Sequence, residues 1–244
     1  MLTHPGAAWL YIFNDIMEEP PMTERIIFFD VIETLFSLKP LQRAFVDEGL
    51  TETDGKLLFA QLLRDAFALS ATGVYRPFPE LARATLEVVL ENAGVPAESG
   101  RIKRILGCFS ELPAHPDVKP ALARVREAEG VRAVLLTNGS RDNTEKLLEK
   151  AGLTDLADEV ISIDSLEVWK PRAEVYQGAA RKMGISPNQA TLIAAHAWDT
   201  HGAMRAGFHA VWVRRQDAQF HPLMDPPADK VDGLEQAVEV ALGL

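Results

Sequence analysis

Arg25-Ile-Ile-Phe-Phe-Asp30-Val-Ile-Glu33-Thr34-Leu35-Phe36 is the stretch that decides the fold of this 244-residue chain. Its run of four apolar residues, bounded by polar ones, predicts a strand buried on both faces, as in a parallel sheet. Asp30 follows the strand directly, and open α/β sheets bind ligands outside the carboxyl ends of their strands. Asp is also a good helix N-cap, with Thr34 as a second one, so this stretch alone leaves both a catalytic and a capping role open.

The charge and the cysteine content of the chain argue against several classes of partner and site. A net charge of −10 and a pI near 5.1 argue against a nucleic-acid or anionic-membrane partner. A local cationic pocket can still bind a small anion. Cys108 is the only cysteine, which excludes an intramolecular disulfide and a multi-cysteine metal site.

The first 24 residues predict an extension outside the fold. Their apolar run Ala-Ala-Trp-Leu-Tyr-Ile-Phe is too short to span a bilayer. No Lys or Arg precedes Arg25, so the basic start of a secretory signal is missing. We therefore expect a cytoplasmic protein with no membrane partner.

Helical and strand patterns divide the rest of the chain. Residues 40–112 carry four helical patterns and no convincing strand, whereas helix and strand patterns alternate from residue 119 onward. The predicted fold class is α/β, with a Rossmann-like parallel sheet core and an inserted helical cap. The expected parts are an N-terminal extension (1–24), an α/β core domain (25–38 and 116–244) and a helical cap (39–115).

Polar clusters follow three of the predicted strands. They are Asp30 with Glu33 and Thr34, then Thr137-Asn138-Gly139-Ser140, then His196-Ala-Trp198-Asp199. Because parallel strands end at one edge of the sheet, these clusters should converge on one crevice. Lys170-Pro171 lies in a connection that can reach the same edge.

Taken in order, these motifs resemble those of the haloacid dehalogenase (HAD) superfamily. The resemblance rests on Asp30 with Thr34, on Thr137-Asn138-Gly139, on Lys170-Pro171, and on Asp199 ahead of Gly202-Ala203-x-x-Ala206-Gly207. It covers nearly all of residues 25–214 and includes a cap between the first two motifs. It implies the HAD-like fold with Asp30 as the nucleophile.

Two positions depart from the Mg²⁺-dependent phosphatases of that superfamily. Ile32 stands where phosphatases have a second, general-acid Asp, and Ala194 stands where they have a metal-ligating Asp. Mg²⁺ requires octahedral oxygen coordination, usually with one or two carboxylates. We therefore expect no metal and no other cofactor.

The last motif is instead similar to the Ala-Trp-Asp-x-x-Gly-Ala of the metal-independent L-2-haloacid dehalogenases. Tyr176 matches that subgroup's tyrosine, Trp198 its pocket tryptophan, and Arg64 the expected place of its leaving-group arginine. The resemblance implies that Asp30 displaces halide from an L-2-haloalkanoic acid, and that water then hydrolyses the aspartyl ester to a D-2-hydroxy acid. The implied partner is a small halogenated carboxylic acid, and we expect a homodimer.

The resemblance also implies a role for each of several residues. Lys170 keeps Asp30 ionised, Asp199 orients Lys170 or water, and Arg64 binds the halide. Thr137 and Asn138 hold the substrate carboxylate, Ile32 and Trp198 exclude bulk water, and Tyr176 orients a neighbouring polar group. The expected substrate-binding residues are thus Ile32, Thr34, Arg64, Thr137, Asn138, Tyr176 and Trp198.

Glu33 and His196 replace a Gly and an Asn of the dehalogenase pattern. A carboxylate with an imidazole has the composition of a general-base dyad, in which neutral His196 takes the proton of the hydrolytic water and Glu33 orients it. The plainer interpretation is a solvated Glu33 and a polar substitute at His196. A phosphatase of the same fold and a silent carboxylate-binding protein stay open as alternative functions.

Overall fold

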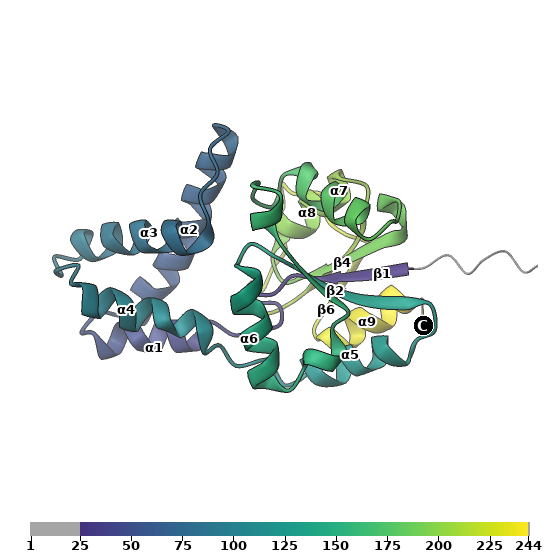
Figure 1. Ribbon diagram of the computed structural model, residues 1–244, viewed down its shortest axis with the longest axis horizontal. Coiled ribbons are helices and arrows are strands. Elements are labelled where there is room, and N and C mark those ends of the chain that lie inside the picture. Colours follow the sequence, from purple (N-terminus) through teal and green to yellow (C-terminus); the bar gives the residue numbers. More distant parts are fainter. Residues whose placement is uncertain (1–24, 244) are drawn as a thin grey trace, which may run out of the picture.

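The computed structural model describes residues 25–243, and the predicted extension 1–24 lies outside them. Two bodies are seen in Figure 1, a sheet with flanking helices and a separate group of helices beside the carboxyl ends of the strands. The second group is the inserted cap, formed by α1 (Lys39–Asp47), α2 (Glu52–Ala71), α3 (Phe78–Asn92) and α4 (Ser99–Gly107).

The core is one six-stranded sheet whose described strands are all parallel, in the order β3-β2-β1-β4-β5-β6. β1 and β4 are neighbours, and the chain proceeds in opposite directions across the sheet from them. Such a switch point opens a crevice at the carboxyl ends of the strands. The strands are β1 (Arg25–Phe29), β2 (Val131–Thr137), β3 (Glu159–Ser162), β4 (Ala190–Ala194), β5 (His209–Val213) and β6 (Asp229–Val231).

Helices cover both faces of the sheet. In Figure 1, α7 (Ala173–Lys182) and α8 (Ala197–Arg205) lie on one face, and α5 (Val118–Glu127) and α9 (Leu234–Leu242) on the other. α6 (Arg141–Ala151) packs against β3. β1 forms as predicted, and its last four residues, which alternate between the two faces of the sheet, are all buried. The predicted fold class is confirmed.

The ends of two predicted helices differ from the structure, and one strand was not predicted. The helix expected over 98–112 ends at Gly107 and continues as a 3₁₀ turn, Cys108–Ser110. α8 begins at Ala197 rather than at Gly202, so the Trp198-Asp199 pair lies inside its first turn. β6 has one apolar residue in three and no alternating pattern, and it was not predicted.

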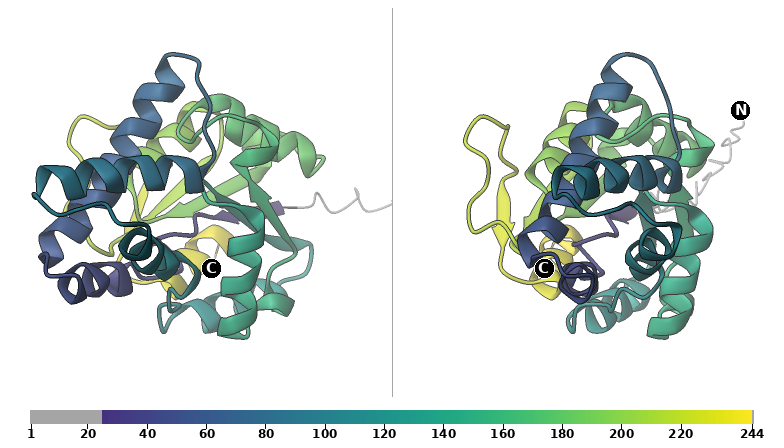
Figure 2. Two further views of the ribbon diagram at one scale, coloured as in Figure 1. Left: turned by 60° about the vertical axis from the view of Figure 1, so that its left-hand side comes forward. Right: turned by 90° about the vertical axis from the view of Figure 1, so that its left-hand side faces the viewer.

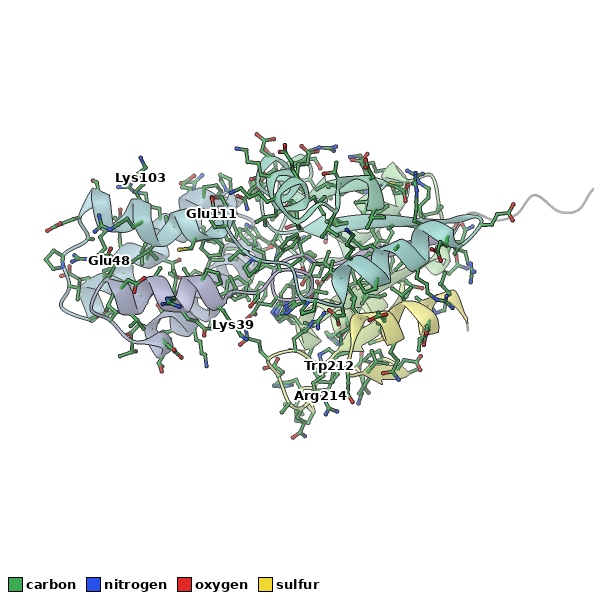
Figure 3. The ribbon with its side chains drawn as sticks, turned by 90° about the horizontal axis from the view of Figure 1, so that it is seen from below. Lys39, Glu48, Lys103, Glu111, Trp212 and Arg214 are labelled. Carbon is green, nitrogen blue, oxygen red and sulfur yellow. The ribbon has the colours of Figure 1, made fainter. Side chains whose placement is uncertain are left out.

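The cap has its own packing and also touches the core. Glu48, which is labelled in Figure 3, follows α1. It forms ion pairs with Arg101 and Arg104 of α4, which ties the two helices together. Towards the core, Trp169 donates its indole N–H to the carbonyl of Arg76 at 3.0 Å. Viewed from the cap, the four cap helices lie across the end of the sheet (Figure 2). None of the helices in residues 25–243 is long and apolar enough to cross a membrane.

Candidate active site

Asp30 lies at the switch point, one residue beyond the end of β1. Its side chain is 7% exposed and accepts a hydrogen bond from Thr34 at 2.7 Å, through Oδ2. The Thr34 hydroxyl in turn accepts the backbone N–H of Ala195 at 2.9 Å, which joins the ends of β1 and β4. Asp30 thus acts neither as a helix cap nor as a solvated turn residue.

Lys170 provides the buried cation of the site. Its ammonium lies 2.8 Å from Asp30 Oδ1 and 2.7 Å from Asp199 Oδ2, and it donates to the carbonyl of Leu136 at 3.0 Å. All three donor protons are therefore used. Burial would lower the pKa of Lys170, but the two carboxylates outweigh it and raise the pKa above its ordinary value.

The two carboxylates on Lys170 differ in acidity. Burial raises the pKa of Asp30, but the charges of Lys170 and His196 overcome this and bring the pKa well below its ordinary value. Burial and the nearby charge of Asp30 raise the pKa of Asp199, against the opposing effect of Lys170. Environments that separate two carboxylates in this way assign them different roles. Asp30 is the more acidic of the two.

Asp199 is held in place by the helices on one face of the sheet. Tyr176 of α7 donates its hydroxyl to Asp199 Oδ1 at 2.6 Å. Gly202 of α8 lies so close to the chain that a Cβ there would stand 2.6 Å from the Pro171 Cβ and 2.9 Å from the Tyr176 hydroxyl. Glycine at 202 is therefore required for α8 to approach the Lys170-Pro171 segment.

His196 lies between two carboxylates. Its Nε2 is 2.9 Å from Glu33 Oε2, and its Nδ1 is 3.4 Å from Asp30 Oδ2. Nδ1 is buried and has no hydrogen-bond partner among the described residues, since 3.4 Å is a charge contact rather than a well-formed hydrogen bond. Burial disfavours the imidazolium, but Asp30 and Glu33 prevail and raise the pKa of His196 to about 10. In the resting protein His196 is a cation, whereas the sequence suggested a neutral base.

Glu33 adopts a backbone conformation that is unfavourable for its type. Its φ is 68°, in the left-handed region that normally favours glycine. Such a conformation costs about 1 kcal/mol or more for a non-glycine residue, and it persists where the surroundings impose it. In this conformation the Glu33 carboxylate contacts His196 through Oε2 and Gln216 through Oε1.

Arg64 does not lie where the sequence placed it. Its side chain is 62% exposed and bonds to Asp65, and it lines none of the cavities around Asp30. The buried face of α2 contains Phe59, Leu62 and Ala66, so Arg64 points to the opposite side of the helix. The expectation that Arg64 binds halide is corrected: Phe59 and Leu63 of α2 line the cavity instead.

The remaining expected residues gather around a small cavity over Asp30, of about 20 Å³, which has room for about one water molecule. Trp198 stacks on His196 at a ring distance of 5.1 Å and meets Phe67 of the cap at 5.3 Å. The polar end of the cavity is formed by Thr137 and Asn138, whose side-chain oxygens accept the N–H groups of Gly139 and Lys170. Ile32, Thr137, Asn138, His196 and Trp198 all line it.

These side chains do not fit the Mg²⁺ site of the fold's phosphatases. Asp30 and Asp199 already share the Lys170 ammonium, and Ala194 offers no oxygen ligand. Within residues 25–243, no group of three or more His, Cys, Asp or Glu side chains is arranged to hold a metal ion. The site instead offers the Asp30 carboxylate, which lines a mainly apolar cavity and is flanked by the cations of Lys170 and His196.

Comparison with known proteins identifies the family. The family model of the haloacid dehalogenase-like hydrolases matches residues 24–207. The chain belongs to this family. It is 26% identical over 222 residues to (S)-2-haloacid dehalogenase 1 of Pseudomonas sp. (strain CBS-3), a match that covers 90% of this chain and 97% of the relative. It is 25% identical to haloacetate dehalogenase H-2 of Moraxella sp. (strain B), over 88% of this chain and 96% of the relative.

Solved structures of haloacid dehalogenases share the fold. The L-2-haloacid dehalogenase of Xanthobacter autotrophicus with chloropropionic acid covalently bound superposes with a TM-score of 0.79 at 22% identity, over 90% of this chain and 99% of that one. The resemblance to the L-2-haloacid dehalogenases found in the sequence is confirmed by these matches.

Proposed function

We propose that the protein is a hydrolytic dehalogenase that converts L-2-haloalkanoic acids to D-2-hydroxy acids and halide. The observation that carries the proposal is the pairing of an ionised, buried Asp30 with Lys170, in an apolar cavity without the ligand set for Mg²⁺. The curated relatives named above are dehalogenases, and the Xanthobacter enzyme holds chloropropionic acid covalently. That adduct is of the type we assign to Asp30.

In the first step an oxygen of Asp30 attacks C2 of the substrate. The new C–O bond forms as the carbon–halogen bond breaks, and the halide leaves with its electron pair. The configuration at C2 is inverted in this step, and Asp30 becomes a neutral ester. Trp198, Ile32 and Phe59 exclude bulk water from the reacting atoms. Thr137 and Asn138 hold the substrate carboxylate at the polar end of the cavity.

His196 takes the role that the sequence assigned to Arg64. Its ring lines the cavity and its Nδ1–H makes no hydrogen bond within the described residues, so we infer that it stabilises the charge that develops on the departing halide. Ester formation then removes the charge of Asp30, one of the two anions that raise the pKa of His196. We infer that His196 releases its proton as the halide leaves and becomes the neutral base of the second step.

In the second step water attacks the carbonyl carbon of the Asp30 ester. His196 accepts the proton of this water while Glu33, bound to Nε2, stabilises the imidazolium that forms again. The acyl C–O bond breaks, the leaving alkoxide takes the second proton of the attacking water, and Asp30 returns to a carboxylate. The product keeps the original Asp30 oxygen as its hydroxyl. The whole cycle releases one halide and one proton. A general base of this kind contributes about 100- to 10,000-fold to the step.

A halide-release panel tests the function. Purified protein with 2-chloro-, 2-bromo- and 2-fluoropropionate, with and without EDTA, should release halide from L-enantiomers regardless of chelator. Asp30→Asn should abolish the release. Hydrolysis of an aryl phosphate that EDTA stops, without halide release, would instead identify a phosphatase. Binding of the acids without turnover would identify a silent binding protein. The expected homodimer and cytoplasmic location stay predictions, and light scattering in solution tests the first.

A further inference from the structure

A second, larger cleft opens beside the reaction cavity, between the cap and the core. Its volume is about 300 Å³, against about 20 Å³ around Asp30. Ile32, Phe78, Thr137 and Gly139 line both spaces, so the two lie side by side. A cavity of the smaller size has no room for a long alkyl chain. A longer substituent has to extend into a neighbouring space.

The cleft is built for an apolar occupant. Phe78 and Ala82 of α3, Leu106 of α4 and Phe109 form its cap side. Phe78 is fixed by an edge-on contact with Phe109 at 5.1 Å, and it also stacks on Trp169 at 6.3 Å. The wall is therefore preformed.

Two polar side chains on the opposite wall, at the start of α6, already have hydrogen-bond partners within the protein, and the charged Asp142 and Lys146 on the same wall are exposed. Ser140 accepts the backbone N–H of Asn143, and Asn143 donates its amide to the carbonyl of Phe109 at 2.9 Å. They do not require a polar ligand.

A third space, on the other side of His196, is lined by more charged side chains. It measures about 210 Å³, and four charged side chains line it, Glu33, Lys56, Arg215 and Asp217, together with apolar ones. The lining of the cleft at Phe78 contains two, Asp142 and Lys146. An alkyl chain therefore meets fewer charged groups in the cleft at Phe78.

We propose that the cleft between α3, α4 and α6 binds the alkyl chain of the substrate, so that the enzyme accepts 2-haloalkanoic acids longer than propionate. This inference rests on the proposed function, because the carboxylate and C2 are placed over Asp30. Burying one methylene strengthens binding about fourfold, or 0.8 kcal/mol. The cleft is open on one side, so we expect about two- to fourfold for each methylene. From propionate to hexanoate, three methylenes give roughly 8- to 60-fold.

The experiment measures binding separately from turnover. Calorimetric titration with unhalogenated propionate, butanoate, pentanoate and hexanoate gives the affinity for each chain length. Ala82→Phe fills the cleft and should abolish the gain per methylene. Leu106→Trp fills it from a half-buried position and serves if the first variant does not fold. Val88→Phe is the matched control. Val88 is half-exposed on the outer side of α3, the helix that contains Ala82, so this variant should keep the gain per methylene.

Halide release from 2-bromopropionate and 2-bromohexanoate is measured on the same proteins. The inference predicts that the ratio of their kcat/KM values follows the binding series in wild type and collapses in the filled variants. An affinity that does not depend on chain length, or a gain that survives in both filled variants, overturns it. Chain-dependent binding without any halide release would instead overturn the proposed function and leave the cleft as an alkyl-chain site.

Discussion

Asp30→Asn is the sharpest probe of the charge coupling in the site. The amide has the shape of the carboxylate and, like the ester we propose, carries no charge. In the wild type, Oδ2 of Asp30 lies 3.4 Å from Nδ1 of His196. With an effective dielectric constant of about 20, two unit charges at that distance attract by about 5 kcal/mol. Since about 1.4 kcal/mol corresponds to one pKa unit, this is large enough to cancel the rise in the pKa of His196 from 6.5 to about 10.

We therefore expect the pKa of His196 to return to near neutrality in Asp30→Asn. The assay is an NMR titration of the imidazole signals, with His196→Asn used to assign the resonance. Glu33→Gln is the matched control, because it removes the other anion and should also lower the pKa while leaving Asp30 in place. A pKa of His196 that stays at about 10 in Asp30→Asn would refute the coupling, and with it the idea that ester formation turns His196 into a base.

Three further predictions follow from the same contacts. Glu33→Gly relieves the left-handed backbone at φ 68° but removes the partner of His196, so it should lower the rate of ester hydrolysis about 100-fold or more while ester accumulates, as seen by quenched-flow mass spectrometry. Folding raises the pKa of His196, so its contribution to the free energy of unfolding is complete below pH 6.5 and is lost as the pH rises towards about 10. Urea denaturation across this pH range should show a decline in the free energy of unfolding that His196→Gln lacks. Lys170→Met leaves two buried carboxylates without their cation and should cost about 3–5 kcal/mol of unfolding free energy, with loss of halide release, and an unchanged denaturation midpoint would contradict this.

The sequence predicted the elements that have a strong local pattern. β1 is an unbroken apolar run that ends at Asp30, and the polar clusters after β1, β2 and β4 meet as parallel topology requires. β6 was missed because Asp-Lys-Val has neither alternation nor an apolar run, and its pairing with β5 depends on the tertiary fold. The start of α8 was missed because its first turn consists of motif residues rather than an apolar stripe.

In the candidate site, too, some features could be predicted from the sequence and others depend on the tertiary fold. Asp30, Lys170 and Asp199 were identified by their resemblance to the motifs of the family, and the structure brings them within hydrogen-bond distance. Arg64 was misplaced although the signal was present: Leu58, Leu62 and Ala66 define the buried face of α2, and Arg64 lies two residues, or about 200°, from Leu62. The same reasoning would have pointed to Phe59. The protonation of His196 was not predictable, since it depends on distances between groups far apart in the sequence.

The central claim, that an oxygen of Asp30 becomes bonded to substrate carbon, is tested most directly by a single turnover in H₂¹⁸O with enzyme in excess. The account predicts a 2-hydroxy acid free of ¹⁸O, with the label in the peptide that contains Asp30. A product that carries ¹⁸O after one turnover, with Asp30 unlabelled, would contradict it, because water would then have displaced the halide directly.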